Sequence, residues 1–528
     1  MTATTVVIDG AAALSACQQH RLEIVEKHGR HRQIRMKSRG RTCGEVLASR
    51  PDRRFFDQVG GIFSGTFASD FGKDCPLRKP RDHRPAVDHN PSDDSQVADE
   101  RRSLLGLAAM ALIIGAATGC VGAVFRLLLA HADRLRDAMI AWAYGHAIWG
   151  FLIVVGTCAV ATLVAAWMVR QFSPHASGSG IPHVEAVLRE EIPPAPFGLV
   201  PVKFIGGILA IGSGLALGRE GPTVQMGAGI AVFAARVCRL CGADSRVLLA
   251  AGAGAGLATA FNAPIAGLVF VLEELVQRIE HRVAIAALAA LATAIPVARL
   301  LLGDAPDFQI GPLSYPSAES APLFFTLGGI AGLLAVAYNR TLLATIAVRD
   351  RFGRLPIELR AGLIGASVGM LAWFAPELVG GGDQITQRTL IGRESVGILG
   401  FAFLVRFGLG ALSYAAGTPG GLFAPLLVLG AQSGQLFGAA CRLAFPKLAV
   451  QPEAFALVGM AAFFTGVVRA PVTGIVLVAE MTGNVTMLLP MLGACFMAML
   501  LPMLLGNAPI YDSLREHTLR LERQIRQR

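Results

Sequence analysis

The chain has 528 residues, of which 53% are hydrophobic and only 16% are charged, and its mean hydropathy is +0.54. Soluble globular domains carry about 25% charged residues, so this composition indicates a polytopic membrane protein and excludes an ordinary soluble domain. The formal net charge of +10 does not require a nucleic-acid partner, because Lys and Arg collect in the cytoplasmic loops of membrane proteins.

The first 102 residues form a polar extension rich in Arg and His. It contains 18 of the 47 Lys and Arg residues and no apolar stretch of the kind found in a secretory signal. Segments 78–85 and 90–100 have the composition of disordered chain, so we expect residues 1–102 to be a disordered cytoplasmic extension. It could be a tether, an interaction tail or an over-long gene start.

Apolar segments begin directly after Arg101 and Arg102, and this basic pair predicts a cytoplasmic N-terminus. Two long spans are expected over residues 104–130 and 148–169, with a polar helical segment around 133–137 between them. Later apolar segments are short and are cut by Gly and Pro at 178–182, 218–222, 262–264, 380–382, 420–425 and 469–471. Irregular backbone at membrane depth is tolerated only where protein buries it or where it lines a cavity, so these breaks predict a buried polar site.

The two halves of the apolar region resemble each other. Pairs with an offset of 203 are Lys203 and Arg406, Phe204 and Phe407, Gly207 and Gly410, Gly218 and Gly421, and Pro222 and Pro425. Pairs with an offset of 207 are Ala263 and Ala470, Pro264 and Pro471, Gly267 and Gly474, and Glu273 and Glu480. Paired broken segments predict a binding site between two repeats, although similarity alone leaves open whether the repeats are parallel or inverted. The predicted units are repeats at 103–310 and 311–510, followed at 511–528 by a pore-lining tyrosine and a basic cytoplasmic tail.

The segment from Gly218 to Pro222 places an acidic residue, Glu220, inside an apolar run long enough to cross a bilayer. An ionisable residue at membrane depth costs about 2.5–3.5 kcal/mol on insertion scales, so it indicates a function. Gly218 and Gly221 permit a tight turn, and Pro222 suits the first turn of a new helix. The prediction is a broken helix whose free N–H groups point at an anion, with the Glu220 carboxylate competing for the same donors.

Three glycine-bearing breaks follow one another in a fixed order: Gly178-Ser179-Gly180-Ile181-Pro182, Gly218-Arg219-Glu220-Gly221-Pro222 and Gly421-Leu422-Phe423-Ala424-Pro425. Together with Tyr511, they closely resemble the CLC family of chloride channels and chloride/proton antiporters over residues 103–520. The resemblance implies an all-α polytopic membrane protein, an inverted repeat of two halves whose broken helices meet at a central anion site. It further implies a homodimer with a pore in each subunit and both termini in the cytoplasm. The short tail after Tyr511 is typical of prokaryotic members without a C-terminal regulatory domain.

The resemblance assigns a chloride site to these breaks. Chloride carries one charge and has no preferred geometry, so helix N-termini, each with about half a unit charge, can attract it without trapping it. The Ser179 and Tyr511 hydroxyls are each expected to donate a hydrogen bond. Outside the motif set, Ser179 would be interpreted as a helix cap and Tyr511 as an interfacial aromatic residue. The remaining chloride-binding residues are expected to be Gly180, Ile181, Gly221, Leu422 and Phe423.

Glu220 is expected to act as gate and proton carrier, because its ionised carboxylate can occupy an anion position and its protonated form loses affinity for the helix ends. By the resemblance, the inner proton acceptor is Glu274, the second acid of an adjacent pair. Glu273 has a counterpart, Glu480, in the second half and is expected to be structural. Met481 stands opposite Glu274 in the repeat, which indicates that the function of Glu274 is unique to the first half.

The sequence therefore predicts a secondary active chloride/proton antiporter of the bacterial inner membrane, with chloride, protons and membrane lipid as partners. The alternative is a passive CLC-type chloride channel, and fluoride export, a membrane enzyme and a receptor are further candidates. No catalytic triad or nucleotide-binding loop is found, and we expect no enzyme activity, no cofactor, no metal and no nucleic-acid partner. Cys238 and Cys241 have the spacing of a redox or zinc pair, but no second ligand pair follows. His183, where many relatives are acidic, could tune the charge of the inner mouth or simply pack.

Overall fold

The computed structural model describes residues 22–25, 33–38, 41–47 and 92–527, apart from 241, 352–354, 393 and 449. The chain divides into two units, Met1–Ala86 and Val87–Arg528. The segment 78–85 and Cys241 lie outside the described residues.

The first unit contains a three-stranded antiparallel sheet in the order β1-β2-β3. Its strands are β1 (Leu22–Val25), β2 (Gln33–Ser38) and β3 (Arg41–Leu47). Residue 24 pairs with residue 34, and residue 34 with residue 46. The sequence of β2 alternates polar and apolar residues, which is the pattern of a strand, although it lies within the extension that was expected to be disordered.

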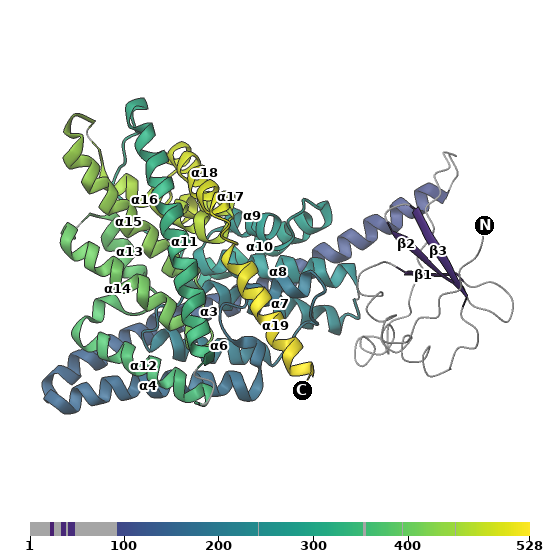
Figure 1. Ribbon diagram of the computed structural model, residues 1–528, viewed down its shortest axis with the longest axis horizontal. Coiled ribbons are helices and arrows are strands. Elements are labelled where there is room, and N and C mark those ends of the chain that lie inside the picture. The colour runs from purple at the N-terminus through teal and green to yellow at the C-terminus, as the bar shows by residue number, and fades with distance from the viewer. Residues whose placement is uncertain are drawn as a thin grey trace. The chain divides into compact units, whose positions relative to one another are not determined.

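The second unit is built from helices (Figure 1). The first is α3 (Ser92–Ala143), so residues 92–100, expected to be disordered, are helical. Acidic residues near its start favour a helix N-terminus. The helices that follow are α4 (Ala147–Phe172), α5 (Ile181–Leu188), α6 (Leu199–Gly212), α7 (Glu220–Val237), α8 (Ala243–Phe261), α9 (Pro264–Phe270) and α10 (His281–Leu302). A π-helical turn, η3 (Val271–Leu275), continues α9.

The later helices are α11 (Ala321–Arg351), α12 (Ile357–Phe374), α13 (Asp383–Leu390), α14 (Val396–Ala415), α15 (Phe423–Ala444), α16 (Pro452–Val468), α17 (Pro471–Thr482), α18 (Leu488–Leu504) and α19 (Ile510–Gln527). Short 3₁₀ turns are η1 (Tyr144–His146), η2 (Pro174–Ala176), η4 (Ala318–Ser320), η5 (Pro376–Leu378) and η6 (Pro446–Leu448). All six breaks predicted from Gly and Pro lie at junctions between helices, and five of them include the first residues of the helix that follows. The polar residues near 133–137 do not interrupt α3, which runs through them.

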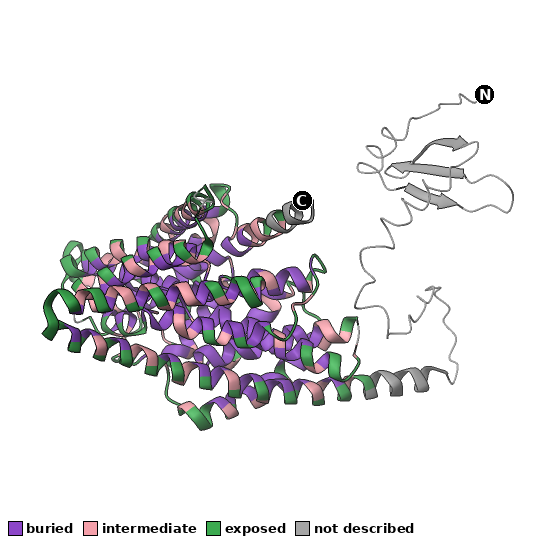
Figure 2. Cartoon of the chain, turned by 90° about the horizontal axis from the view of Figure 1, so that it is seen from below, coloured by how far each residue is buried: buried purple, intermediate pink, exposed green. Residues whose placement is uncertain are grey.

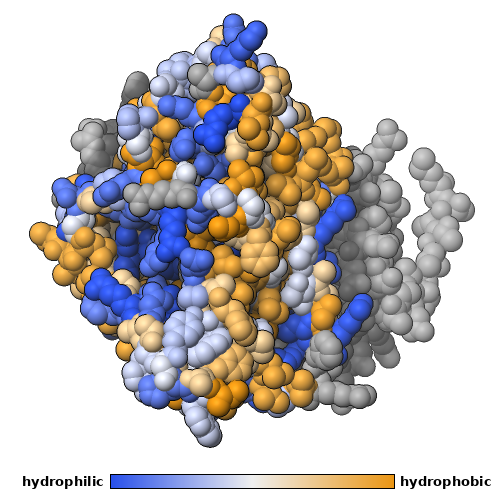
Figure 3. All heavy atoms as spheres, turned by 90° about the vertical axis from the view of Figure 1, so that its left-hand side faces the viewer, coloured by the Kyte–Doolittle hydropathy of each residue, from blue (hydrophilic) through white to orange (hydrophobic). Residues whose placement is uncertain are grey.

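Six helical segments in the described part are long and apolar enough to cross a membrane. Buried residues fill the middle of the helical unit, while many outer residues are exposed (Figure 2). The exposed residues include large apolar side chains such as Leu300, Leu404 and Leu443, which suit contact with lipid better than with water. One face shows broad hydrophobic surface beside a concentrated hydrophilic area (Figure 3).

The helix pairs α7–α8 and α15–α16 pack backbone against backbone. A Cβ atom on Gly252 would lie 2.5 Å from the Gly227 carbonyl oxygen, and one on Gly459 would lie 2.4 Å from the Gly430 carbonyl oxygen. Small residues that let helices approach closely are a common basis of packing within membranes. Gly227 and Gly430 differ by the offset of 203 found in the sequence, so the two halves repeat their packing as well as their motifs.

Equivalent acids in the two halves also make equivalent contacts. The Glu273 carboxylate, from η3, accepts hydrogen bonds from the backbone N–H groups of Val472 and Thr473, at 3.0 and 2.7 Å. The Glu480 carboxylate, from α17, accepts them from Ile265 and Ala266, at 3.0 and 2.8 Å. Each half therefore satisfies the free donors at the start of a helix in the other half.

Candidate anion and proton site

Backbone hydrogen bonds join the three glycine-bearing breaks. Gly178 donates to the Thr418 carbonyl at 3.1 Å, and its own carbonyl accepts from Gly420 at 3.1 Å. Gly218 and Gly421 exchange a reciprocal pair of hydrogen bonds at 2.8 and 2.7 Å. Because α5, α7 and α15 each begin within three residues of these contacts, their N-termini are brought to one region of the molecule.

Glycine is required where these turns meet. A Cβ atom on Gly221 would lie 2.4 Å from the Ser179 carbonyl oxygen and 2.5 Å from its hydroxyl. A Cβ atom on Gly218 would lie 2.0 Å from the Glu220 carboxylate. Both distances are far below a van der Waals contact, so any side chain here would displace the residues around the site. Gly180 adopts φ 89°, a left-handed conformation that favours glycine, immediately before α5.

Two buried cations hold the glycine loops in place. Lys203 Nζ donates to the carbonyl oxygens of Ala176 and Gly178, at 3.0 and 2.7 Å. In the second half, the Arg406 guanidinium donates to carbonyl oxygens of a second glycine loop, those of Leu378, Gly380 and Gly381. The pairing of Lys203 with Arg406 was visible in the repeat, but this clamping role could not be read from the sequence.

The hydroxyls of Ser179 and Tyr511 are fully buried and close enough to each other to interact, but neither forms a hydrogen bond of regular geometry with a described residue. A buried polar group without a partner costs about 1–3 kcal/mol, so such groups call for an explanation such as a bound ligand. The Tyr511 ring stacks against Phe423, with centroids 6.1 Å apart and planes 23° apart. Tyr414, which sequence reasoning missed, also belongs here, because its hydroxyl accepts from the Ser179 N–H at 3.4 Å.

The residues proposed for chloride from the sequence therefore lie around one buried region. Ser179 and Gly221 approach each other directly, while Leu422 and Phe423 follow Gly421 into the fully buried start of α15. Ile181, at the start of α5, is also fully buried.

Glu220 is fully buried and faces protein rather than lipid. One carboxylate oxygen lies 3.5 Å from the backbone N–H of Ala424, in the first turn of α15. The other has no hydrogen-bond partner among the described residues. Sequence reasoning proposed the N–H groups of Leu422 and Phe423 for an anion, and the structure adds that of Ala424.

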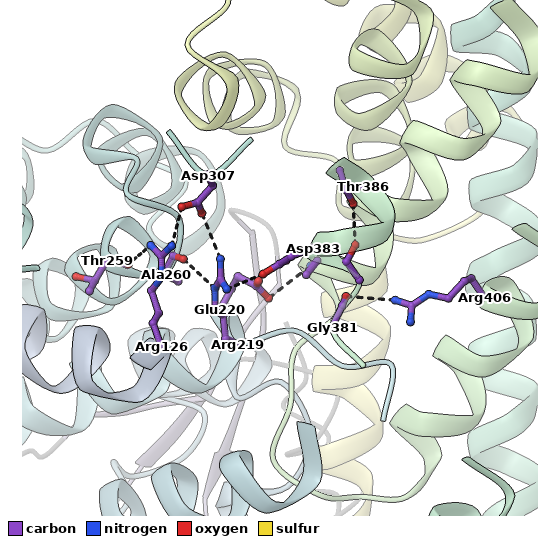
Figure 4. A network of polar contacts seen from close by, with 12 residues as sticks. Arg126, Arg219, Glu220, Thr259, Ala260, Asp307, Gly381, Asp383, Thr386 and Arg406 are labelled. Carbon is purple, nitrogen blue, oxygen red and sulfur yellow. Dashed lines mark hydrogen bonds and ion pairs between the residues drawn. The ribbon is translucent and has the colours of Figure 1, made fainter. Parts of the chain in front are cut away.

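Arg219, which precedes Glu220, binds two aspartates and a backbone carbonyl. Its Nη1 lies 2.7 Å from an Asp383 carboxylate oxygen, its Nη2 lies 3.2 Å from Asp307, and its Nε donates to the Ala260 carbonyl at 3.0 Å (Figure 4). Neither acid was singled out in the sequence, because both are far from Arg219 along the chain.

Glu274 lies in a separate group of carboxylates. It is 8% exposed, sits in the π-helical turn η3, and is acted on by the charges of Glu185 and Asp512. Glu185, in α5, is 1% exposed and also escaped sequence reasoning. Arg515 of α19 lies 4.0 Å from Glu185 and 2.9 Å from Asp512, so a cation borders this acidic group. Turns of π-helix are frequent at functional sites.

A cavity of about 700 Å³ reaches the glycine loop that contains Ser179. Gly178, Gly180, His183, Arg349 and Arg360 are among its lining residues. The rings of His183 and His175 lie 4.9 Å apart there. Three arginines and one acid, Asp350, line the cavity, and such an excess of positive charge attracts anions from solution.

Comparison with known proteins agrees with this architecture. The family described as voltage gated chloride channel matches residues 161–502. The chain is 38% identical over 425 residues to the H(+)/Cl(-) exchange transporter ClcA of Salmonella arizonae, covering 79% of this chain and 89% of that protein. A ClcA protein of Salmonella newport matches to the same extent.

Solved structures agree as well. A slow cyanobacterial Cl-/H+ antiporter superimposes with a TM-score of 0.75 and 31% identity, over 78% of this chain and 98% of that one. A eukaryotic CLC transporter shares the fold with a TM-score of 0.67 and 24% identity, over 78% of this chain and 74% of that one. These findings confirm the predicted multi-pass, helical CLC architecture of the membrane part. The chain belongs to the voltage gated chloride channel family, the CLC family that its glycine motifs resemble.

Proposed function

We propose that this protein is a secondary active antiporter that exchanges chloride for protons across a membrane. The observation that carries the proposal is the Glu220 carboxylate, which is fully buried and lies beside the Ala424 N–H at the start of α15. An acidic side chain in a position suited to an anion links the two ions, because the side chain is an anion only when it has lost its proton. The names of the relatives and of the cyanobacterial structure support this assignment.

Chloride would bind where the broken helices begin. The Ser179 and Tyr511 hydroxyls would each donate a hydrogen bond, supported by their burial without a hydrogen bond of regular geometry to a described residue. Backbone N–H groups of Gly180, Ile181, Leu422 and Phe423 would supply further donors and the positive ends of the helix dipoles. Gly221 would keep the space beside Ser179 open. The protein would therefore hold chloride mainly with partial charges, which bind an ion without trapping it.

Protonation would decide whether Glu220 or chloride occupies the start of α15. The ionised carboxylate competes with chloride for the Ala424 N–H. The protonated side chain has no net charge and loses much of its attraction to the helix end, so chloride can replace it. Each cycle would move chloride one way and a proton the other, without covalent catalysis, cofactor or metal.

Glu274 would pass protons between the solution and Glu220. Its position in a group with Glu185 and Asp512, none of which is a proposed chloride residue, supports two routes that meet at Glu220. A passive chloride channel would need no such acceptor. We further propose that the protein is a homodimer in the bacterial inner membrane with both termini in the cytoplasm, consistent with the basic residues of α19.

The test is purified protein in lipid vesicles loaded with chloride, with chloride efflux and proton uptake recorded together. An antiporter will drive protons into the vesicles against their gradient as chloride leaves, and the proton movement will stop when chloride is replaced by an impermeant anion. Chloride efflux without proton movement would identify a channel instead. No chloride flux at all would refute both.

A further inference from the structure

Arg219, the residue before Glu220, is held on three sides. Its guanidinium contacts the Ala260 carbonyl and the carboxylates of Asp307 and Asp383 (Figure 4). These contacts fix the direction of the guanidinium, because the planar group offers its donors in a rigid fork. Arg219 is 17% exposed, and both its charge and that of Asp383 act on the Glu220 carboxylate. The environment of Glu220 therefore depends on how completely Arg219 is neutralised.

The two aspartates that neutralise Arg219 differ in their exposure and in the number of arginines that they bind. Asp307 is 8% exposed and also binds Arg126 at 2.6 Å, so it bridges two arginines inside the protein. Asp383 is 48% exposed and binds Nη1 of Arg219, whereas Asp307 binds Nη2. Asp383 also lines a cavity of about 380 Å³. Asp307 thus has the position of a structural bridge, while Asp383 is the partner that solution can reach.

The loop that carries Asp383 is tied to the surrounding protein by hydrogen bonds and close contacts. Arg406 binds the carbonyl oxygens of Gly380 and Gly381 at 2.7 and 3.2 Å. Gly382 adopts φ 102°, and a Cβ atom there would lie 2.6 Å from Arg406 Nη2. The Gly382 carbonyl accepts the backbone N–H of Thr386 in α13 at 2.9 Å. Asp383 is therefore placed against Arg219 by a loop that these contacts hold.

The charges around Glu220 come from several elements, and Tyr511 is the titratable residue that faces it from α19. The charged residues are Arg126 of α3, Arg219 before α7, Asp307 after α10 and Asp383 of α13. Within this ion-pair network the two arginines are matched by the two aspartates, and the charges of Arg406 and Asp133 also reach Asp383. Without the Asp383 carboxylate, one positive charge would be left uncompensated.

We propose that Asp383 is a positioning residue for the exchange reaction: by holding and neutralising Arg219, it sets how readily the neighbouring Glu220 takes up a proton. This inference rests on the proposed function of Glu220. Loss of the Asp383 charge would let Arg219 stabilise the ionised Glu220 carboxylate, so a lower pH would be needed to protonate it. The same uncompensated charge would hold chloride more tightly wherever chloride replaces the carboxylate. Asp383 therefore keeps the positive charge near Glu220 low enough that both the ionised carboxylate and chloride can leave the start of α15.

The first measurement is chloride flux through vesicles at equal pH inside and out, over a range of pH. We expect flux to rise as the pH falls in the unmodified protein, and the midpoint to move to a lower pH in Asp383→Asn by about one unit, a tenfold change in proton affinity. The matched control is Glu377→Gln, an acid lining the same cavity that pairs with Arg388 at 2.9 Å instead of Arg219. Its midpoint should stay where it is. An unmoved or raised midpoint in Asp383→Asn would overturn the inference.

A double-mutant cycle tests whether Asp383 acts on Glu220 through the charge of Arg219. In an Arg219→Gln background, Asp383→Asn should shift the midpoint much less than in the unmodified protein, because there is no arginine charge left to release. An undiminished shift would show that Asp383 acts by another route and would refute the positioning role.

A measurement of chloride binding tests the role of Asp383 independently of the proposed antiport. In Glu220→Gln protein the carboxylate is absent, so calorimetric chloride binding does not depend on proton exchange. There, Asp383→Asn should tighten chloride binding severalfold and Glu377→Gln should not. If vesicles show no proton coupling but this tightening is found, the antiport proposal fails and the electrostatic role of Asp383 stands. If Asp383→Asn does not tighten chloride binding in this background, the role of Asp383 is refuted.

Discussion

Glu273 and Glu480 occupy equivalent positions in the two halves, and each carboxylate caps the first turn of a helix in the other half, α17 and α9 respectively. A reciprocal pair of this kind is what a two-fold relationship between the halves produces. It explains why an acid recurs at the end of two apolar segments. It also explains why Glu274, which follows Glu273 directly, is left for another purpose.

Removal of one cap should destabilise the fold. Glu480→Ala leaves the N–H groups of Ile265 and Ala266 without their acceptor, at an expected loss of about 1–3 kcal/mol. The measurement is thermal unfolding in detergent, and Glu516→Ala, which removes an exposed acid from a contact with Arg520, is the control. Equal melting temperatures in the two variants would show that the reciprocal caps do not stabilise the fold.

Glu220→Gln should abolish proton coupling and retain chloride movement. The amide has the shape of the protonated acid but can neither ionise nor carry a proton, so the start of α15 stays open to chloride. Simultaneous recording of the two ions in vesicles will test this, with Glu377→Gln as the exposed-acid control. Full proton coupling in Glu220→Gln would remove Glu220 from the mechanism.

Glu274→Gln should lower proton transport at least about tenfold and leave chloride binding intact, because Glu274 is not among the residues proposed to hold chloride. The neighbouring variant Glu273→Gln is the matched control, since its carboxylate is turned toward Val472 and Thr473. It should retain proton transport even if it melts earlier. Proton rates that fall equally in both variants would argue against a specific role for Glu274.

The hydroxyl of Tyr511 should contribute to chloride binding, and its ring to the coupling of chloride with protons. Tyr511→Phe keeps the ring stacked on Phe423 and removes one hydrogen bond, so chloride binding should weaken by about a few fold. Tyr511→Ala removes a fully buried ring and should let chloride pass without its proton, which lowers the ratio of protons to chloride. Calorimetry and paired flux recordings will separate the two effects. Identical coupling in both variants would show that the ring does not contribute to coupling beyond the hydroxyl.

Gly459→Ala should disrupt packing between α15 and α16. The new methyl group would lie 2.4 Å from the Gly430 carbonyl oxygen, so the helices would have to separate, at a cost of about 1–3 kcal/mol. Gly408→Ala is the control, because a Cβ atom there meets no described atom within 4 Å and alanine favours a helix more than glycine does. Size-exclusion profiles and melting temperatures will compare them. A Gly459→Ala protein as stable as Gly408→Ala would contradict the close approach.

Much of the architecture follows from local properties of the chain. Hydropathy identified a membrane protein, Gly and Pro marked six of the junctions between helices, and an acid at membrane depth singled out Glu220. The motifs pointed to the CLC family, which the comparisons confirm. The roles of Ser179, Tyr511, Glu220 and Glu274 stay predictions until transport is measured. Residues 92–100 are helical although the sequence predicts disorder there, because composition alone gives no account of a helix that continues into the apolar span.

The sequence by itself determined where the backbone breaks and which acid lies within the membrane, because turn formation and burial depend on neighbouring residues. Only the tertiary structure decided what those groups touch. The Ala424 N–H is 204 residues from Glu220, and Asp383 is 164 residues from Arg219. Such pairings depend on how helices from different parts of the chain pack, so no local pattern could have paired Arg219 with the carboxylates that balance its charge.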